Sequence, residues 1–198
     1  MPTADLTRQR LIRAALELFT TKGYHDTTTA QIAKKAGVAE GTIYRHFLSK
    51  QHLLNELYRA ALRWALEVVQ VPSGAPPAPR TPAPLTSPRA TLALVAQGLV
   101  EGAARDPAVV KLGLLGRHEA VLDEESRIAA REFRTAIEHV IAQGKAEGAV
   151  RAGAADVWSG VWLAVVGYAL EKVIAKEWKP GDAAVGLVIE GAWEAIRA

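Results

Sequence analysis

The stretch over residues 28–50, TTAQIAKKAGVAEGTIYRHFLSK, constrains the fold of this chain more than any other part of its sequence. Thr28, followed three residues later by Gln31, predicts a capping box, which satisfies free backbone N–H groups at the start of a helix. Gly37 tolerates the positive φ of a sharp turn and predicts the end of that helix. A second helix is predicted over 39–47, so the stretch consists of two short helices joined by a tight turn.

Small or apolar residues occupy the positions at which two such helices must approach each other closely. They are Ile32, Ala33, Gly37, Val38 and Ile43. This spacing is typical of a helix-turn-helix, in which the second helix crosses the first steeply and enters a DNA groove. Glu40, Thr42 and Arg45 are left facing outward. The pattern therefore predicts a DNA-reading element.

Helices are also predicted on both sides of this element. Residues 7–22 carry an apolar stripe that ends at Gly23, and they should complete a three-helix head. Ser49 is placed to cap a long helix that reaches to about residue 71. Trp64 and Val68 lie off the main apolar stripe of that helix, so it is expected to join the head to a second core.

The rest of the chain is predicted to be helical apart from one loop. Residues 71–89 hold seven of the ten prolines and no acidic residue, which indicates an extended surface loop. Further helices are predicted over 88–104, 107–120, 123–147, 156–178 and 182–197, and no segment alternates as a strand does. We expect an all-α protein of about nine helices. Its DNA-binding head would span residues 1–50, and a larger helical ligand-binding and dimerisation domain would span residues 51–198.

Charge and composition narrow the class of protein. Residues 1–50 hold eight Lys/Arg against four Asp/Glu, whereas residues 51–198 hold 16 against 17, so a modest positive excess lies on the predicted head. The absence of cysteine excludes disulfides and thiolate metal sites. The amino terminus lacks the uninterrupted apolar run of a signal peptide. The most apolar stretch, Val157–Leu170, is shorter than a membrane-spanning helix, so we expect a cytoplasmic protein.

The combination T-x-x-x-I-A-x-x-A-G-V-x-x-G-T-I-Y-x-H-F-x-x-K over residues 28–50 resembles the TetR family of bacterial transcriptional regulators. The resemblance implies that the Thr28 hydroxyl and the positive end of its helix bind a DNA phosphate. It also implies that Tyr44, His46 and Lys50 grip further phosphates, which fix the register of the protein on DNA.

Base reading is implied for the second helix. Arg45 suits guanine O6 and N7, and Thr42 suits a thymine methyl group. Glu40 either accepts a hydrogen bond from cytosine N4 or caps its helix, and both roles stay open. Gly41 lets the helix approach the DNA backbone closely, and Lys34 is a further expected DNA contact. Because one head makes few base contacts, useful specificity requires two heads and a near-palindromic site.

The second head would come from dimerisation. The resemblance implies that the last two helices pair with those of a second copy as a four-helix bundle, giving a homodimer. The alternative is that their apolar surface serves only a monomeric core. In this family a small molecule in the larger domain shifts the spacing of the two heads, so that a repressor leaves its operator.

The residues expected to line such an effector cavity are mostly large and apolar. The apolar candidates are Trp64, Leu92, Leu99, Leu115, Phe133, Ile137, Trp158 and Trp162, and the polar candidates are His118, Glu119, Arg134 and Tyr168. Each of them has core packing as its alternative role. The expected effector is a small, largely apolar aliphatic or aromatic compound, for example an acyl chain or acyl-CoA. No cofactor or metal is predicted.

Two other functions are alternatives to that of a ligand-responsive regulator. An enzyme is not favoured, because His118-Glu119 is only half of a metal-binding motif and lacks a second histidine at i+4. No glycine-rich phosphate loop or G-x-S-x-G motif is present. The other alternative is a ligand-independent DNA-binding protein in which the large domain only dimerises.

Overall fold

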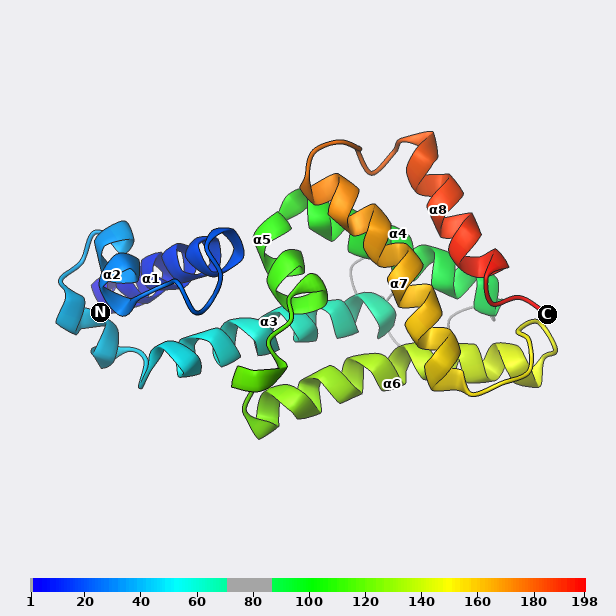
Figure 1. The fold of residues 1–198 in the computed structure, drawn as a ribbon, viewed down its shortest axis with the longest axis horizontal. Coiled ribbons are helices and arrows are strands. Elements are labelled where there is room, and N and C mark those ends of the chain that lie inside the picture. The colour runs from blue at the N-terminus through cyan, green and yellow to red at the C-terminus, as the bar shows by residue number, and fades with distance from the viewer. Residues whose placement is uncertain (1, 71–86) are drawn as a thin grey trace.

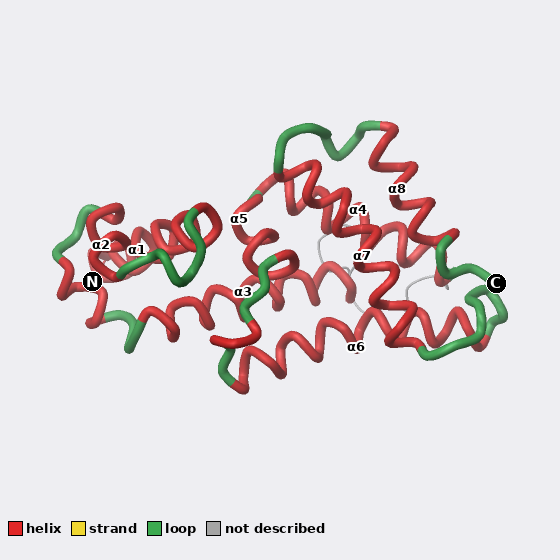
Figure 2. The backbone as a smooth tube through the Cα atoms, viewed as in Figure 1, coloured by secondary structure: helices red, strands yellow, loops and turns green. Residues whose placement is uncertain are grey.

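The computed structural model describes residues 2–70 and 87–198, and these residues form an all-helical protein without strands (Figures 1 and 2). An isolated β-bridge joins Val150 to Arg197 near the carboxyl terminus. The predicted all-α class is confirmed, and each predicted helix has a helical counterpart within the described residues. The loop predicted over 71–89 lies outside the described residues except for its last three, of which Ser87 caps a helix that begins at Pro88.

The head consists of α1 (Pro2–Thr21), α2 (Thr29–Ala36) and η1 (Glu40–Arg45), a 3₁₀ helix. These three elements lie at one end of the molecule, with α1 packed against α2 (Figure 1). Their shared core consists of fully buried apolar side chains, including Leu11, Ala15, Phe19, Ile32, Ile43 and Phe47. Burial of these side chains is the main stabilising contribution to the arrangement of the three helices.

The long helix α3 (Lys50–Gln70) runs from the head into the rest of the molecule and lies beside α6 over much of its length (Figure 1). As its pattern predicted, it is apolar on two sides. Trp64 packs against Gly102, where an added Cβ would lie 2.1 Å from the indole, and Val68 packs against Gly98 in the same way. Because Gly98 and Gly102 have no side chains, α4 can approach α3 closely.

The remaining helices, called the body here, bury apolar side chains that continue the hydrophobic core of the head. They are α4 (Pro88–Arg105), α5 (Pro107–Val110), the π-helical turn η2 (Lys111–Leu115), the 3₁₀ turn η3 (Glu119–Val121), α6 (Glu124–Ala146), α7 (Ala155–Ile174) and α8 (Ala183–Glu194). Ser87, Asp106 and Asp123 cap α4, α5 and α6 by accepting a hydrogen bond from the backbone N–H three residues on. Proline follows the first two caps, as the sequence predicted.

A buried polar clamp ties α3 to the start of α6. The fully buried Asn55 donates from Nδ2 to the Val121 carbonyl at 2.9 Å and accepts at Oδ1 from the Asp123 N–H at 2.9 Å. Gln51 donates to the same Val121 carbonyl at 2.9 Å. Arg59 pairs with the Asp123 carboxylate at 2.9 Å. Asn55 Nδ2 also donates to the Gln51 carbonyl of its own helix at 2.9 Å. Both polar atoms of the buried amide therefore have hydrogen-bond partners, as the burial of a polar group requires.

Two predicted helices differ from those observed in helix type. The second helix of the motif, predicted over 39–47, is the shorter 3₁₀ helix η1, because Ala39 offers no side-chain cap and Gly41 lies in the first turn. The helix predicted over 107–120 is interrupted. It becomes a π-helical turn at Lys111 and ends before Gly116, whose backbone is extended.

Helix α7 is apolar over a longer span than the stretch Val157–Leu170 on which the sequence analysis relied. It spans 20 residues with a mean hydropathy of 1.4, which is enough by length and composition to cross a membrane. Trp162, Val166 and Leu170 are buried in the body core, and one helix of this kind is weak evidence for a membrane span. The helix ends at Ile174, before the predicted Trp178, where Lys176 takes a left-handed conformation with φ 61°.

Candidate nucleic-acid interface and body cavity

The amino terminus of α2 is built as the sequence predicted. Thr28 Oγ1 accepts from the Gln31 N–H at 3.2 Å, and Gln31 Oε1 accepts from the Thr28 N–H at 3.2 Å. This capping box satisfies the N–H groups of Thr28 and Gln31, whereas those of Thr29 and Ala30, in the first turn, have no partner inside the helix. They point out of the exposed end of α2, an arrangement that suits an anion.

The turn after α2 requires a glycine. Gly37 has φ 67°, and its N–H donates to the Lys34 carbonyl at 3.1 Å. A Cβ at this position would lie 2.7 Å from Arg10 Nη2. The left-handed conformation disfavours residues with a Cβ here, whereas the Arg10 guanidinium is the end of a flexible side chain and can move aside. Val38 follows and donates to the Ala33 carbonyl at 3.0 Å, which closes the turn.

The predicted base-reading residues lie on η1. Ile43 is 1% exposed and anchors this helix in the head core, whereas Glu40, Gly41 and Arg45 are exposed and Thr42 is half-buried. Residues three apart eclipse one another on a 3₁₀ helix, so Thr42 and Arg45 lie on one side of η1. Two side chains that can read base edges are therefore presented together.

The predicted phosphate contacts have different surroundings. Tyr44 is 57% exposed, and its hydroxyl lies 3.2 Å from Thr29 Oγ1 at the start of α2. His46 is half-buried at the end of η1. The Lys50 ammonium donates at 2.8 Å to the carbonyls of Tyr24 and Thr27 and lies 4.2 Å from the centre of the Tyr24 ring.

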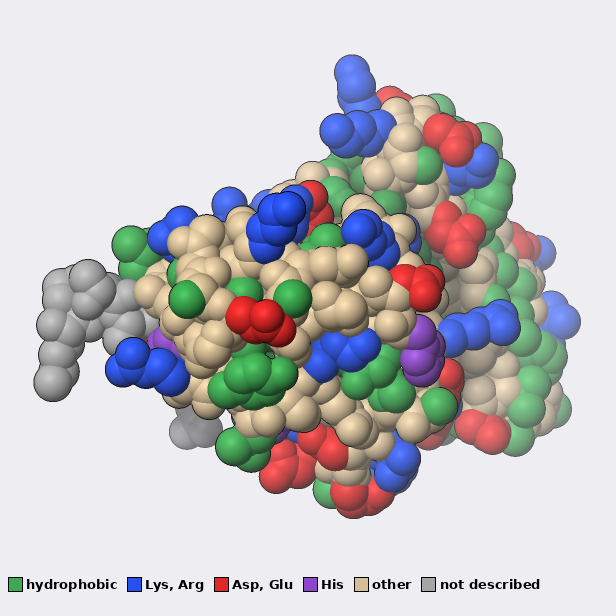
Figure 3. Space-filling view, turned by 60° about the vertical axis from the view of Figure 1, so that its left-hand side comes forward, with side chains coloured by type: hydrophobic (Ala, Val, Ile, Leu, Met, Phe, Trp, Pro, Cys, Tyr) green, Lys and Arg blue, Asp and Glu red, His purple; other side chains and the backbone are tan. Residues whose placement is uncertain are grey.

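Lys50 thus holds the loop before α2, a role that its sequence position did not reveal. Two of its three ammonium N–H groups are committed within the protein, which leaves one for a phosphate. Lys34 is exposed, and Lys35 pairs with Glu17 at 2.6 Å. Lys and Arg side chains are dispersed over the forward face with acidic groups among them (Figure 3), in agreement with the modest charge surplus.

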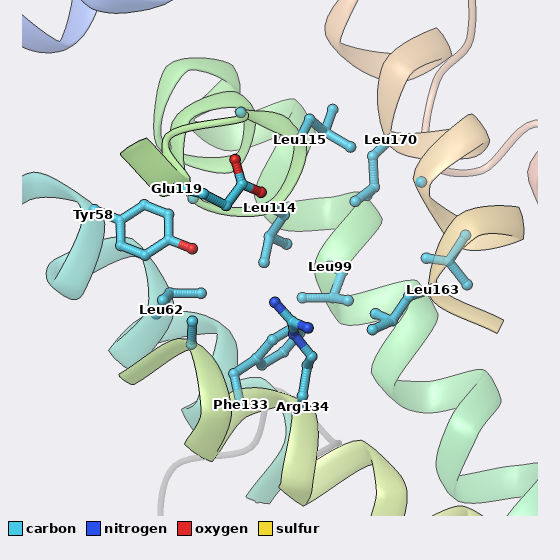
Figure 4. Close-up of a pocket in the computed structure, with 15 residues that line it drawn as sticks. Tyr58, Leu62, Leu99, Leu114, Leu115, Glu119, Phe133, Arg134, Leu163 and Leu170 are labelled. Atoms are coloured by element: carbon cyan, nitrogen blue, oxygen red, sulfur yellow. The ribbon is translucent and has the colours of Figure 1, made fainter. Parts of the chain in front are cut away.

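A cavity of about 180 Å³ lies in the body among α3, α4, α6, α7 and the turns η2 and η3 (Figure 4). Of the predicted lining residues, Leu99, Leu115, Phe133, Glu119 and Arg134 line it. Sequence reasoning missed its other lining residues, which are Tyr58, Leu62, Gly113, Leu114, Gly116, Ala130, Leu163, Val166, Gly167 and Leu170. Most of these carry the same helical spacing as ordinary core residues, so no sequence signal separates them.

The other predicted lining residues lie elsewhere. Leu92, Ile137 and Trp162 are fully buried in the body core. Trp64 lines a second, wider space of about 1000 Å³ between α1 and the body. Trp158 donates from Nε1 to the Ala152 carbonyl at 3.1 Å.

Two predicted polar anchors also stand outside the cavity lining. His118 packs edge-on against Tyr58 with ring centres 6.1 Å apart, and its Nε2 is buried without a hydrogen-bond partner among the described residues. Burial lowers the pKa of His118 despite the nearby Glu119 carboxylate and Leu112 carbonyl. Tyr168 is 48% exposed on α7 and packs edge-on against Trp178.

Sequence comparison finds relatives that match the head and the start of α3. Residues 11–57 match the family described as bacterial regulatory proteins, tetR family. The HTH-type transcriptional regulator SrpR from Pseudomonas putida is 53% identical over 51 residues, which are 26% of this chain and 24% of the relative. The fatty acid metabolism regulator protein of Bacillus subtilis is 40% identical over 58 residues, 29% of this chain and 30% of the relative. The similarity thus spans between a quarter and a third of these curated relatives.

Structural comparison extends the likeness to the whole fold. A TetR family transcription regulator from Marinobacter aquaeolei VT8 superposes with a TM-score of 0.74 at 17% identity, covering 98% of this chain and 96% of the other. The ketosteroid transcriptional regulator KstR2 of Mycobacterium tuberculosis gives a TM-score of 0.71 at 19% identity, covering 96% and 95%. Residues 11–57 of this chain thus match the tetR family of bacterial regulatory proteins, and the whole chain shares the fold of solved TetR family regulators.

Proposed function

We propose that this protein is a transcriptional repressor that binds a palindromic DNA operator as a homodimer and leaves it when a small molecule occupies the body cavity. The observation that carries the DNA-binding part is the head, in which a capped α2 and the exposed residues of η1 stand together. The matched segment over residues 11–57 covers this head from the middle of α1 onward.

The head supports a division of labour between affinity and specificity. The open end of α2, Tyr44 and Lys34 present donors and positive charge to phosphates, which position the protein but read no sequence. Thr42 and Arg45 project from one side of η1 toward base edges. Glu40 and Gly41 are exposed at the start of η1, where they would meet the DNA first.

Dimerisation is supported by the exposed sides of α7 and α8, called the α7/α8 face here. These neighbouring helices expose small and apolar residues, namely Val157, Gly160, Ala164, Tyr168, Gly186, Leu187 and Gly191. A Cβ added at any of the three glycines would meet open space, so none of the residues that the structure describes packs on them. Such a face suits close packing against the same face of a second copy.

Release by an effector would follow from linkage. A ligand that favours a spacing of the two heads other than the one DNA requires lowers the affinity for DNA. Bound DNA then lowers the affinity for the ligand by the same factor. The cavity touches α3, which starts in the head, and η3, whose Val121 carbonyl holds Asn55 and Gln51 of α3. A ligand that moves η3 would therefore act directly on the helix that carries the head.

Selection of bound duplexes from a random DNA pool, followed by titration at two salt concentrations, tests the DNA-binding part. We expect enrichment of an inverted repeat whose binding weakens steeply with salt, because phosphate contacts release counterions. Failure of the purified protein and of ligand-stripped protein to enrich any sequence would contradict the proposal. A single half-site without a repeat would contradict the dimer.

A further inference from the structure

Three polar side chains converge on the otherwise apolar cavity of the body. Figure 4 shows the Tyr58 hydroxyl, the Glu119 carboxylate and the Arg134 guanidinium directed into the space between them. They come from α3, η3 and α6, which are far apart in the sequence. None of the three makes a hydrogen bond or ion pair with another residue in the described part of the chain. Polar groups that converge on a cavity without protein partners are typical of a ligand site.

Tyr58 is a fixed hydrogen-bond donor at the wall of this cavity. It is 8% exposed, and the ring of His118 packs edge-on against it. Burial raises the pKa of Tyr58, so the hydroxyl keeps its proton at neutral pH. The positive charge of Arg134 lowers this pKa and the negative charge of Glu119 raises it, so both charged groups are near the same hydroxyl.

The remaining lining sets the size of the ligand body. Leucines from α3, α4, η2 and α7, with Phe133 from α6, surround a volume of about 180 Å³. A dry cavity of roughly 150 Å³ holds a benzene molecule. The space therefore accepts one ring or a short chain. A small aromatic compound or a short aliphatic chain, both expected from the sequence, fits this volume, whereas an acyl-CoA does not.

The charged groups set the polar ends of the ligand. A guanidinium presents paired donors that match a carboxylate. A carboxylate such as that of Glu119 only accepts hydrogen bonds, so it requires a donor on the ligand. Both groups are exposed, and no ion pair joins them within the described part of the chain. A molecule that spans them needs an acid at one end and a donor at the other.

We propose that the cavity binds a small aromatic hydroxy acid, with its carboxylate on Arg134, its hydroxyl on Glu119 and its ring among the leucines. Tyr58 donates to whichever ligand oxygen lies nearest to it. The inference rests on the proposed function only in taking this ligand to be the effector.

Binding calorimetry on the full chain tests the ligand class without DNA. The probes are para-hydroxybenzoate, benzoate, which lacks the donor, phenol, which lacks the acid, and decanoate, which exceeds the cavity. We expect para-hydroxybenzoate to bind about tenfold more tightly than benzoate or phenol, because each loses a hydrogen bond to a charged group. Decanoate should not displace para-hydroxybenzoate from the cavity.

Variants separate the roles of the two charged residues. Arg134→Gln should weaken the binding of the two carboxylate probes, para-hydroxybenzoate and benzoate, about tenfold or more and leave the binding of phenol nearly unchanged. Glu119→Ala should weaken the binding of the two hydroxyl probes, para-hydroxybenzoate and phenol. Benzoate should bind equally well or more tightly, because the variant lacks a negative charge that repels its carboxylate. Tyr58→Phe keeps the ring and should weaken para-hydroxybenzoate several-fold. Arg131→Gln is the matched control, since Arg131 lies on α6, outside the cavity lining, and pairs with Glu124.

Two results would overturn this inference. One is tighter binding of decanoate than of para-hydroxybenzoate, and the other is binding of no aromatic acid at all. Both leave the DNA-binding part of the proposed function standing, since duplex selection measures it separately. Binding of para-hydroxybenzoate with the expected variant pattern supports the inference even if DNA is not released, and only the regulatory link would then fail.

Discussion

At the level of single residues, Arg45 and Lys50 are both cations of the head, but their surroundings give them different tasks. Arg45 is exposed on η1 and has no ion pair within the described chain. Lys50 is half-buried, and its ammonium joins the start of α3 to the carbonyls of Tyr24 and Thr27. The first can contact a base edge, whereas the second fixes the loop that leads into α2.

Replacing each of these cations by alanine should therefore have a distinct effect on DNA binding. Arg45→Ala should relax base preference at one position in each half-site, at about 1 to 3 kcal/mol. Lys50→Ala should weaken binding to all sequences alike and flatten the salt dependence by about one charge, if its third N–H meets a phosphate. Titration of the operator and of single-base variants at several salt concentrations measures both. Equal, sequence-blind losses for the two variants would contradict this division.

His118 should make stability depend on pH. Burial lowers its pKa below the ordinary 6.5, so the unfolded chain binds a proton first as the pH falls. The free energy of unfolding should then decrease as the pH falls below about 6.5, the unfolded pKa, toward the lower folded pKa. His118→Phe keeps a ring against Tyr58 and should reduce this decrease, measured as the shift in urea midpoint. An unchanged pH dependence in the variant would assign it to other groups.

At the level of elements, the end of α7 stores backbone strain. Lys176 has φ 61°, while the neighbouring Glu177 N–H donates to the Lys172 carbonyl at 3.0 Å, as in a Schellman cap. A residue with a Cβ costs about 1 to 2 kcal/mol in this conformation. The cap geometry is therefore one that glycine would adopt more easily than lysine.

Lys176→Gly should stabilise the protein by about 0.5 to 1 kcal/mol, since part of the relieved strain is offset by the greater freedom of glycine in the unfolded chain. The ion pair between Lys172 and Glu177 does not involve this side chain. Ala175→Gly is the matched control, because φ is −71° there and glycine should destabilise. Urea unfolding of the three proteins measures the effect, and a loss of stability in Lys176→Gly would refute the strain argument.

The sequence predicted elements well where a local rule decides them. The capping box at Thr28, the left-handed turn at Gly37 and the proline that follows Ser87 each act within one helical turn, and all three are observed. The prediction was wrong at η1 and after Lys111, where helix type depends on a weak start or on packing. The cavity lining was predicted only in part, because Tyr58 carries the same spacing as its core neighbours.

At the level of the whole molecule, the head and the cavity are joined by one short series of contacts. Glu119 belongs to η3, and the Val121 carbonyl of η3 accepts from Asn55 and Gln51 of α3. The same helix begins at Lys50, which holds the loop before α2. Spatial continuity alone does not establish coupling. It does identify η3 as the element that a ligand on Glu119 would move first.

The dimer is the remaining requirement of the proposed function, and the α7/α8 face gives a direct test of it. Leu187 is 73% exposed on α8, so Leu187→Glu leaves the core of the single chain intact. In a four-helix bundle the new carboxylate would lie buried and unpaired in the interface, which typically costs several kcal/mol. We expect the variant to sediment as a monomer and to lose tight binding to the full inverted repeat, while the thermal unfolding of each chain stays cooperative.

Ile128→Glu, at a site 42% exposed on α6, is the matched control and should stay dimeric. If Leu187→Glu remains a dimer, the two heads must be brought together by another surface, and the palindromic operator would need a different geometry from the one inferred here.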